Sequence, residues 1–153
     1  MVKGTAQEYE DDIVPGRVWI GDLLYLPKSA EGHRFCFVLT ERLSSYVCGI
    51  PLKSLSTHQV NSAFTQFLSI MPQMEVIITD HGRGDFGPAF TQMCAEWGIR
   101  HGGSIPNRLQ VQASCEISNK ILTNQLARIC SSDHGKRNWH KYLAKAIQSI
   151  RSI

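Results

Sequence analysis

The sequence lacks any apolar run approaching the roughly 18 residues of a membrane-spanning helix, and its start shows no basic segment followed by an apolar one. These absences argue against a membrane protein and against export. None of the five cysteines forms a Cys-x-x-Cys pair, and their odd number does not suit a disulfide framework. We therefore expect free, buried thiols in a reducing compartment.

Metal-ligand patterns of the soft type are also scarce. Cys130, His134 and His140 form one loose group near the end of the chain. Their spacing matches no usual zinc pattern, and the set is one ligand short of a structural site. We do not interpret them as a zinc site.

A strong net charge is missing too, at +3 over 153 residues. The length and the 42% apolar content suit one domain with a single core. The charge is uneven, however, because residues 117–153 carry seven basic side chains against Asp133 alone. This basic third could lie beside a polyanion, or it could be an ordinary solvated helix face. The basic residues are Lys120, Arg128, Lys136, Arg137, Lys141, Lys145 and Arg151.

The first half of the chain predicts three strands and a helix. We expect residues 1–13, which are polar and acidic, to be a flexible lead-in to one domain over 14–153. Strands over 16–27, 34–40 and 46–52 would form an antiparallel meander. Ser56 and Gln59 then form a capping box, and Pro72 ends the apolar helical pattern that follows. The phenylalanines of this helix should lie in the core.

The second half alternates strands with helices. A short apolar run over 76–78 predicts a strand, 86–97 a helix, and 99–101 a short strand before a flexible loop over 102–107. One helix should run through 112–129 and a last one over 138–150, with Trp139, Tyr142 and Leu143 on its apolar face. This order predicts a mixed α/β sheet flanked by helices.

Three carboxylates stand out within these elements. Asp22 lies in an otherwise buried strand, where a charge is costly unless a cation or hydrogen bonds satisfy it. Asp80 follows the 76–78 strand, and 35 residues separate it from Glu116. On the helix of Glu116, a polar stripe also contains Gln112, Asn119 and Lys120. Taken alone, Glu116 and Lys120 would read as a surface ion pair.

The ordered set resembles the catalytic core of retroviral and retrotransposon integrases over residues 14–129. The resemblance rests on Trp19-x-x-Asp22, on Thr79-Asp80-x-Gly82 and on Glu116 after its 35-residue interval. Residues 39–46 and 98–101 match further parts of that core. His81, Glu41 and residues 113–115 depart from the family pattern, but none is a presumed metal ligand. The resemblance implies a ribonuclease-H-like fold with a mixed five-stranded sheet.

An oxygen-rich set of three carboxylates suits Mg²⁺ or Mn²⁺ rather than zinc. It fits two-metal phosphoryl transfer, with the ions roughly 3.5–4 Å apart. The resemblance implies that Asp22 bridges both ions while Asp80 and Glu116 each hold one. It also implies 3′-end processing of element DNA, then strand transfer into target DNA, with Gln112, Asn119 and Lys120 contacting the DNA.

The resemblance implies partners and a location as well: double-stranded DNA, a homodimer or higher homo-oligomer, and the host nucleus or a virus-like particle. Neither the zinc module nor the C-terminal DNA-binding module of full integrases is found, so we expect an excised core. Two alternatives stay open. The chain could be a catalytically silent, domesticated scaffold, or a related ribonuclease-H-like nuclease.

Overall fold

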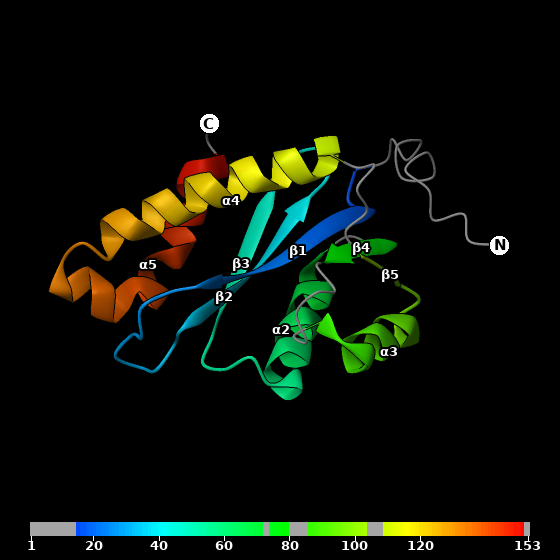
Figure 1. Ribbon diagram of the computed structural model, residues 1–153, viewed down its shortest axis with the longest axis horizontal. Helices are drawn as coiled ribbons and strands as arrows, with labels where there is room; N and C mark the ends of the chain where they lie inside the picture. The colour runs from blue at the N-terminus through cyan, green and yellow to red at the C-terminus, as the bar shows by residue number, and fades with distance from the viewer. Residues whose placement is uncertain (1–14, 72–73, 80–85, 104–108, 152–153) are drawn as a thin grey trace.

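The chain forms a five-stranded mixed sheet flanked by helices (Figure 1). The computed structural model describes residues 15–71, 74–79, 86–103 and 109–151. The predicted fold class is confirmed. In the sheet order β3-β2-β1-β4-β5, the first three strands pair antiparallel and the last pairs are parallel. The strands are β1 (Val18–Tyr25), β2 (Phe35–Glu41), β3 (Val47–Leu52), β4 (Val76–Thr79) and β5 (Arg100–Gly103).

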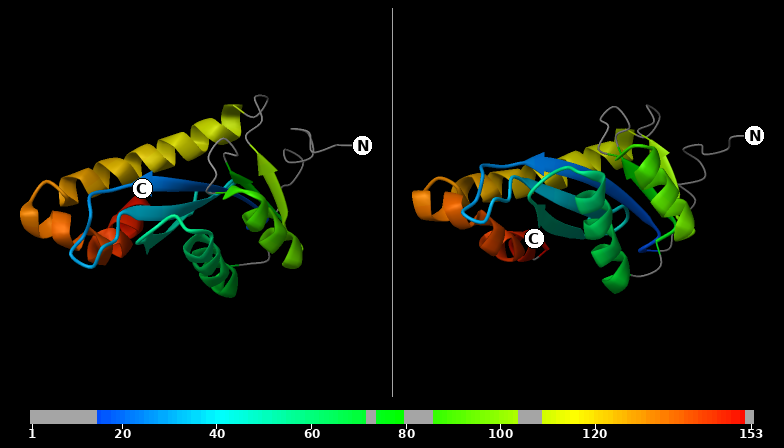
Figure 2. Two further views of the ribbon diagram at one scale, coloured as in Figure 1. Left: turned by 60° about the horizontal axis from the view of Figure 1, so that its bottom comes forward. Right: turned by 90° about the horizontal axis from the view of Figure 1, so that it is seen from below.

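Helices cover both faces of the sheet, as Figure 2 shows with α4 on one side and α2 and α3 on the other. The helices are α2 (Thr57–Ile70), α3 (Pro88–Glu96), α4 (Leu109–Ile129) and α5 (Asp133–Arg151). Successive side chains of a strand point to opposite faces. In β1, Trp19 and Leu23 therefore join the core under α2 and α3, whereas Leu24 joins the core under α4 and α5.

The face under α2 and α3 is packed with aromatic rings. Phe37 is 0% exposed at its centre. Its ring centroid lies 5.5–6.5 Å from those of four other rings. Edge and tilted contacts of this kind stabilise beyond the buried area alone. The prediction that the phenylalanines of α2 lie in the core is confirmed. The four neighbours of Phe37 are Phe64, Phe67, Phe86 and Phe90.

Helix α2 begins with half of the predicted capping box. The Ser56 hydroxyl accepts a hydrogen bond from the Gln59 N–H at 3.2 Å, which satisfies one free donor of the first turn. The Gln59 side chain does not reach back to Ser56. It accepts instead from the Lys53 N–H at 3.4 Å, and so ties the helix start to the end of β3.

The face under α4 and α5 has an aliphatic core around one tryptophan. Leu122 and Leu126 of α4 are fully buried against Trp139 and Leu143 of α5. The predicted apolar stripe of the last helix is therefore confirmed, and that helix packs on its own domain. Tyr142 is only half-buried, and its hydroxyl lies 2.9 Å from His134 Nε2.

Helix α5 has a kink at Asn138, so its second part begins where the sequence predicted, and a first part from Asp133 precedes it. Asn138 has non-helical angles (φ −119°, ψ 16°) within the helix, which the sequence pattern had marked as its beginning. The extra turn depends on Gly135, because a Cβ there would lie 1.7 Å from the carbonyl oxygen of Ile129. Only glycine permits so close an approach between the end of α4 and the start of α5.

The turn between β2 and β3 is held by a buried carboxylate. Glu41 accepts hydrogen bonds from the N–H groups of Leu43 and Ser44 at 3.0 and 2.8 Å, and from the Ser44 hydroxyl at 2.7 Å. Burial alone would raise the pKa of Glu41, but these bonds, with one from the Gly16 backbone, bring it below its ordinary value. Glu41 thus fixes the turn that carries Ser45, whose φ is 61°.

Two further predictions concern β5 and the cysteines. β5 includes Gly102 and Gly103, which were predicted as loop, because both pair with the end of β4. Among the cysteines whose side chains the structure describes, Cys36, Cys48 and Cys94 are buried free thiols and Cys130 is a half-buried one. Burial raises the pKa of Cys36 and Cys94 to about 12. None of the helices in the described ranges has the length and apolar character to span a bilayer.

Candidate functional site

Asp22 lies in the middle of the sheet, on the face covered by α4. Its strand β1 is the central strand of the five. The side chain is half-buried, and its Oδ1 accepts a hydrogen bond from the Leu23 N–H at 2.8 Å. Strand β1 pairs with β2 on one side and with β4 on the other, so the backbone that carries Asp22 is held rigidly.

Asn119 joins α4 to this carboxylate. Its Nδ2 donates to Asp22 Oδ2 at 2.8 Å across 97 positions of sequence. The amide is a neutral donor to a charged acceptor, a stronger bond than one between two neutral groups. Sequence reasoning placed Asn119 among the DNA contacts. In the structure the Asn119 amide holds Asp22 against the helix that carries Glu116, and the DNA contact stays a prediction.

The other predicted residues are only partly placed. Asp80 lies outside the described residues, directly after β4. Glu116 and Gln112 belong to the helical backbone of α4, but their side chains lie outside what the structure describes. Lys120 is exposed, next to Asn119 in α4. The structure therefore brings Asp22 and Asn119 together, and it places Glu116 in the same helix as Asn119, three residues earlier.

His101 was not predicted as a functional residue. Its strand β5 pairs with β4, the strand that precedes Asp80 in the sequence. Its Nε2 is 2.5 Å from the Thr79 hydroxyl, and its Nδ1 is 2.7 Å from the Thr91 hydroxyl. It also packs edge-on against Phe90. Thr79 is the last described residue before Asp80. His101 thus ties the end of β4 to β5 and α3. No short-range pattern signals this, because the partners meet only through parallel strand pairing.

Comparison with protein-family models matches residues 14–108 to the integrase core domain. This match covers more than half of the chain. The chain belongs to the integrase core domain family. The resemblance drawn from the three acids is thereby confirmed, since the matched span contains Trp19, Asp22 and Asp80.

Solved structures share the fold of this integrase core. The crystal structure of the catalytic core domain of BIV integrase aligns with a TM-score of 0.70 at 19% identity, over 88% of this chain and 82% of that one. The cryoEM structure of a simian T-cell lymphotropic virus intasome in complex with PP2A regulatory subunit B56 gamma aligns with a TM-score of 0.69 at 21% identity. That alignment covers 90% of this chain and 49% of the other.

A curated relative is similar in sequence. The retrovirus-related Pol polyprotein from transposon 412 of Drosophila melanogaster is 27% identical over 128 residues. The alignment covers 83% of this integrase core but only 10% of the polyprotein. The chain thus spans about a tenth of the curated relative that it matches.

Integrase core domains generally depend on divalent metal ions, and the residues here fit such ions. Asp22 supplies a carboxylate on a rigid strand, oriented by the Leu23 N–H and the Asn119 amide. Hard divalent cations prefer oxygen ligands, and partners that orient a ligand strengthen its metal binding. Asp22, Asp80 and Glu116 would hold the ions.

Proposed function

We propose that this integrase core is a DNA-processing polynucleotidyl transferase whose catalytic groups are Asp22, Asp80 and Glu116. It would process the 3′ ends of element DNA and then transfer those ends into target DNA. Asp22 would bridge two Mg²⁺ or Mn²⁺ ions, while Asp80 and Glu116 would each hold one. When bound, such ions lower the pKa of an attacking water and stabilise the leaving oxygen.

The observation that carries this proposal is the hydrogen bond from Asn119 to Asp22. It fixes α4 against β1, and Glu116 precedes Asn119 by three residues, the spacing of neighbours along one side of a helix. The parallel pair Ile20 and Ile78 supports the third member of the set. In the sequence, Asp22 and Asp80 each follow their member of this pair by two residues.

The test is a strand-joining assay on branched DNA with and without Mn²⁺. We expect metal-dependent joining by the native chain and none by Asp80→Asn or Glu116→Gln, each with an unchanged unfolding transition. Glu96→Gln, which changes an exposed glutamate of α3, is the matched control and should keep full activity. Full activity in Asp80→Asn would contradict the assignment.

The same assay separates the two alternatives. A ribonuclease-H-like nuclease would cut the DNA and leave no joined product when a 3′-hydroxyl end is supplied. A silent scaffold would bind DNA or protein and show neither product, with or without the acids. Joined product that disappears in Glu116→Gln favours the integrase function over both.

DNA is the proposed substrate and partner, with Gln112, Asn119 and Lys120 as contacts. Lys120 is exposed in α4, beside the residue that bonds Asp22. A lysine on a phosphate contributes through counterion release, so Lys120→Ala should weaken DNA binding and reduce the salt slope by about 1. The proposed setting is the host nucleus or a virus-like particle, in line with the retrovirus-related polyprotein that the chain matches.

A homodimer or higher homo-oligomer is the remaining part of the proposal. The described surface contains a groove of about 890 Å³ beside the edge strand β3, between α2 and α5. Ile70, at its rim, is 76% exposed. We expect sedimentation to show a dimer that Ile70→Glu dissociates, while Trp97→Glu, at another exposed apolar residue, does not. A native monomer would contradict this part.

A further inference from the structure

A second cluster of ligand-type side chains lies away from the three acids, where the loop between β1 and β2 meets α5. Two hydrogen bonds hold this loop against α5 without any metal ion. The Ala30 N–H donates to the Arg137 carbonyl at 2.8 Å, and the Trp139 indole N–H donates to the Pro27 carbonyl at 2.6 Å. The loop and the helix therefore hold a fixed relation to each other.

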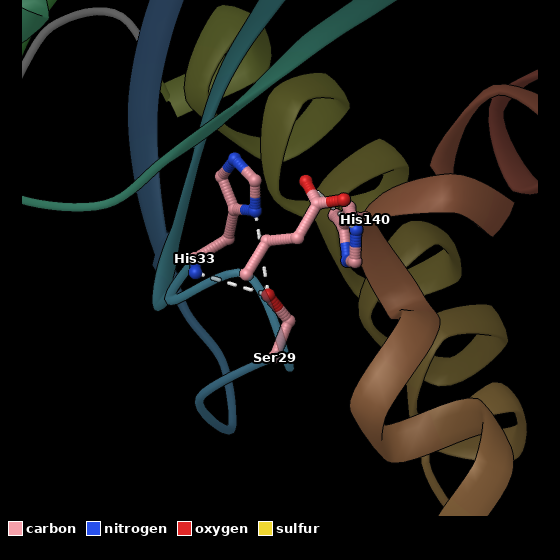
Figure 3. A network of polar contacts seen from close by, with 4 residues as sticks. Ser29, His33 and His140 are labelled. Carbon is pink, nitrogen blue, oxygen red and sulfur yellow. Dashed lines mark hydrogen bonds and ion pairs between the residues drawn. The ribbon is translucent and has the colours of Figure 1, made fainter.

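Glu31 and His33 of this loop lie close to His140 of α5, and Figure 3 shows the two histidines with Ser29. His140 Nε2 is 3.3 Å from Glu31 Oε2, and the two imidazole rings stack with centroids 4.8 Å apart. One donor atom from each of the three side chains lies within 4.8 Å of the others. Two imidazoles and one carboxylate thus lie close together.

His140 is the unusual member. Its side chain is only 7% exposed, yet within the described part of the chain neither ring nitrogen has a hydrogen-bond partner of good geometry. The Glu31 carboxylate lies 3.3 Å from His140 Nε2, close enough for an ion pair, but the two groups do not form a well-aligned hydrogen bond. A buried polar group without such a bond costs about 1–3 kcal/mol, so this arrangement calls for a further ligand.

The ring of His33 is restrained by Ser29. The Ser29 hydroxyl lies 3.3 Å from its Nδ1 and also accepts from the His33 N–H at 3.0 Å. A partner on a ring nitrogen restrains the orientation of the ring.

We propose that Glu31, His33 and His140 bind a divalent transition-metal ion of the zinc class, with solvent completing the coordination. Zinc sites with two histidines, one glutamate and one open position are an established type. Ligands about 2.0–2.1 Å from a tetrahedral ion lie roughly 3.3 Å apart. Glu31 and His140 already meet that spacing, and Glu31, 58% exposed, has room to adjust.

The bound ion would cross-link the β1–β2 loop to α5. Imidazole ligands favour zinc-class ions over Mg²⁺, so the site differs in chemistry from the all-carboxylate set. The two sets share no residue, so this metal-site proposal does not depend on the proposed transferase function.

The experiment is a titration of the whole chain with Zn²⁺ alone, followed by NMR of the imidazole rings of its six histidines. We expect His33 and His140 to shift and to saturate at one ion, while the exposed His58 stays unchanged. Mg²⁺ should not reproduce these shifts. The same shifts should persist in Asp22→Asn, which separates this site from the acids.

Glu31→Gln is the decisive variant, because it removes the charged ligand from a mostly exposed position and should fold normally. Its Zn²⁺ affinity should fall at least about tenfold, with Glu96→Gln unchanged as the matched control. A zinc-induced rise in melting temperature should shrink in parallel. Native-like affinity in Glu31→Gln, or no shift of His33 and His140 with Zn²⁺, would overturn the proposal.

Discussion

The cores on the two faces of the sheet contain different kinds of side chain. Under α2 and α3, aromatic rings fill the space around Phe37, and these residues come from a limited span of the chain. Under α4 and α5, the core is mainly aliphatic, and polar contacts such as Asn119–Asp22 span long sequence distances. Both faces bury a core, and the second also positions the candidate chemistry.

The largest effect should come from opening the aromatic face. Phe37→Ala should lower the free energy of unfolding by about 3–5 kcal/mol, because it removes a fully buried ring from the centre of four others. Urea denaturation measures this loss. The folded fraction should still join DNA, and a variant that keeps its stability but loses joining would break the distinction between the faces.

On the other face, Asn119→Ala should cost activity more than stability. Removing the donor to Asp22 Oδ2 should lower strand joining about 10- to 100-fold, as loss of a positioning partner at a metal ligand does. The unfolding free energy should change by about 1 kcal/mol at most. The metal dependence of joining supplies a second readout, because a loosely held Asp22 should require more Mn²⁺. Unchanged activity would show that Asp22 needs no support from α4.

A smaller, pH-dependent effect is expected at the turn that leads into β3. Glu41→Gln should cost about 1–3 kcal/mol near neutral pH, because a carboxamide cannot accept all the bonds that the carboxylate accepts. The folded pKa of Glu41 is below its ordinary value of 4.5, so its stabilisation is present above that value and is lost as the pH falls through the folded pKa. Denaturation at several pH values should show native and variant converging in acid. A pH-independent difference would contradict this.

The smallest effect should come from the end of α5. Arg151 donates from Nη2 and Nε to the Val47 carbonyl at 2.7 and 3.1 Å, and its guanidinium lies 3.9 Å from the centre of the Tyr46 ring. Arg151→Ala should cost about 0.5–1.5 kcal/mol. Lys145→Ala, at an exposed position of the same helix, should cost almost nothing. Equal effects would mean that the helix end is held by other contacts.

Local pattern predicted much of the aromatic face. The helical spacing of Val60, Phe64 and Phe67 fixes which side of α2 is buried, and all three are buried. The acids were found through their order and spacing, which reflect the family rather than any local preference. The part of α5 before Asn138 was not predicted, because the close approach of Gly135 to the Ile129 carbonyl is a contact that the apolar pattern does not signal.

The polar contacts of the second face could not be predicted in the same way. His33 and His140 are far apart in the sequence, and nothing local links them. The bond of Asn119 to Asp22 depends on where α4 crosses the sheet. Arg151, counted among basic residues for a polyanion or for solvent, bonds the backbone of β3 instead.

The long sequence separation of Asp22 and Asn119 affects the order in which the site is assembled during synthesis. The meander of β1, β2 and β3 is local and can form early in synthesis, since sequential pairings close short loops. Asn119 arrives 97 residues after the aspartate that it holds. The three strands of the meander are therefore synthesised long before Asn119, and an incomplete polypeptide carries Asp22 without the support of Asn119.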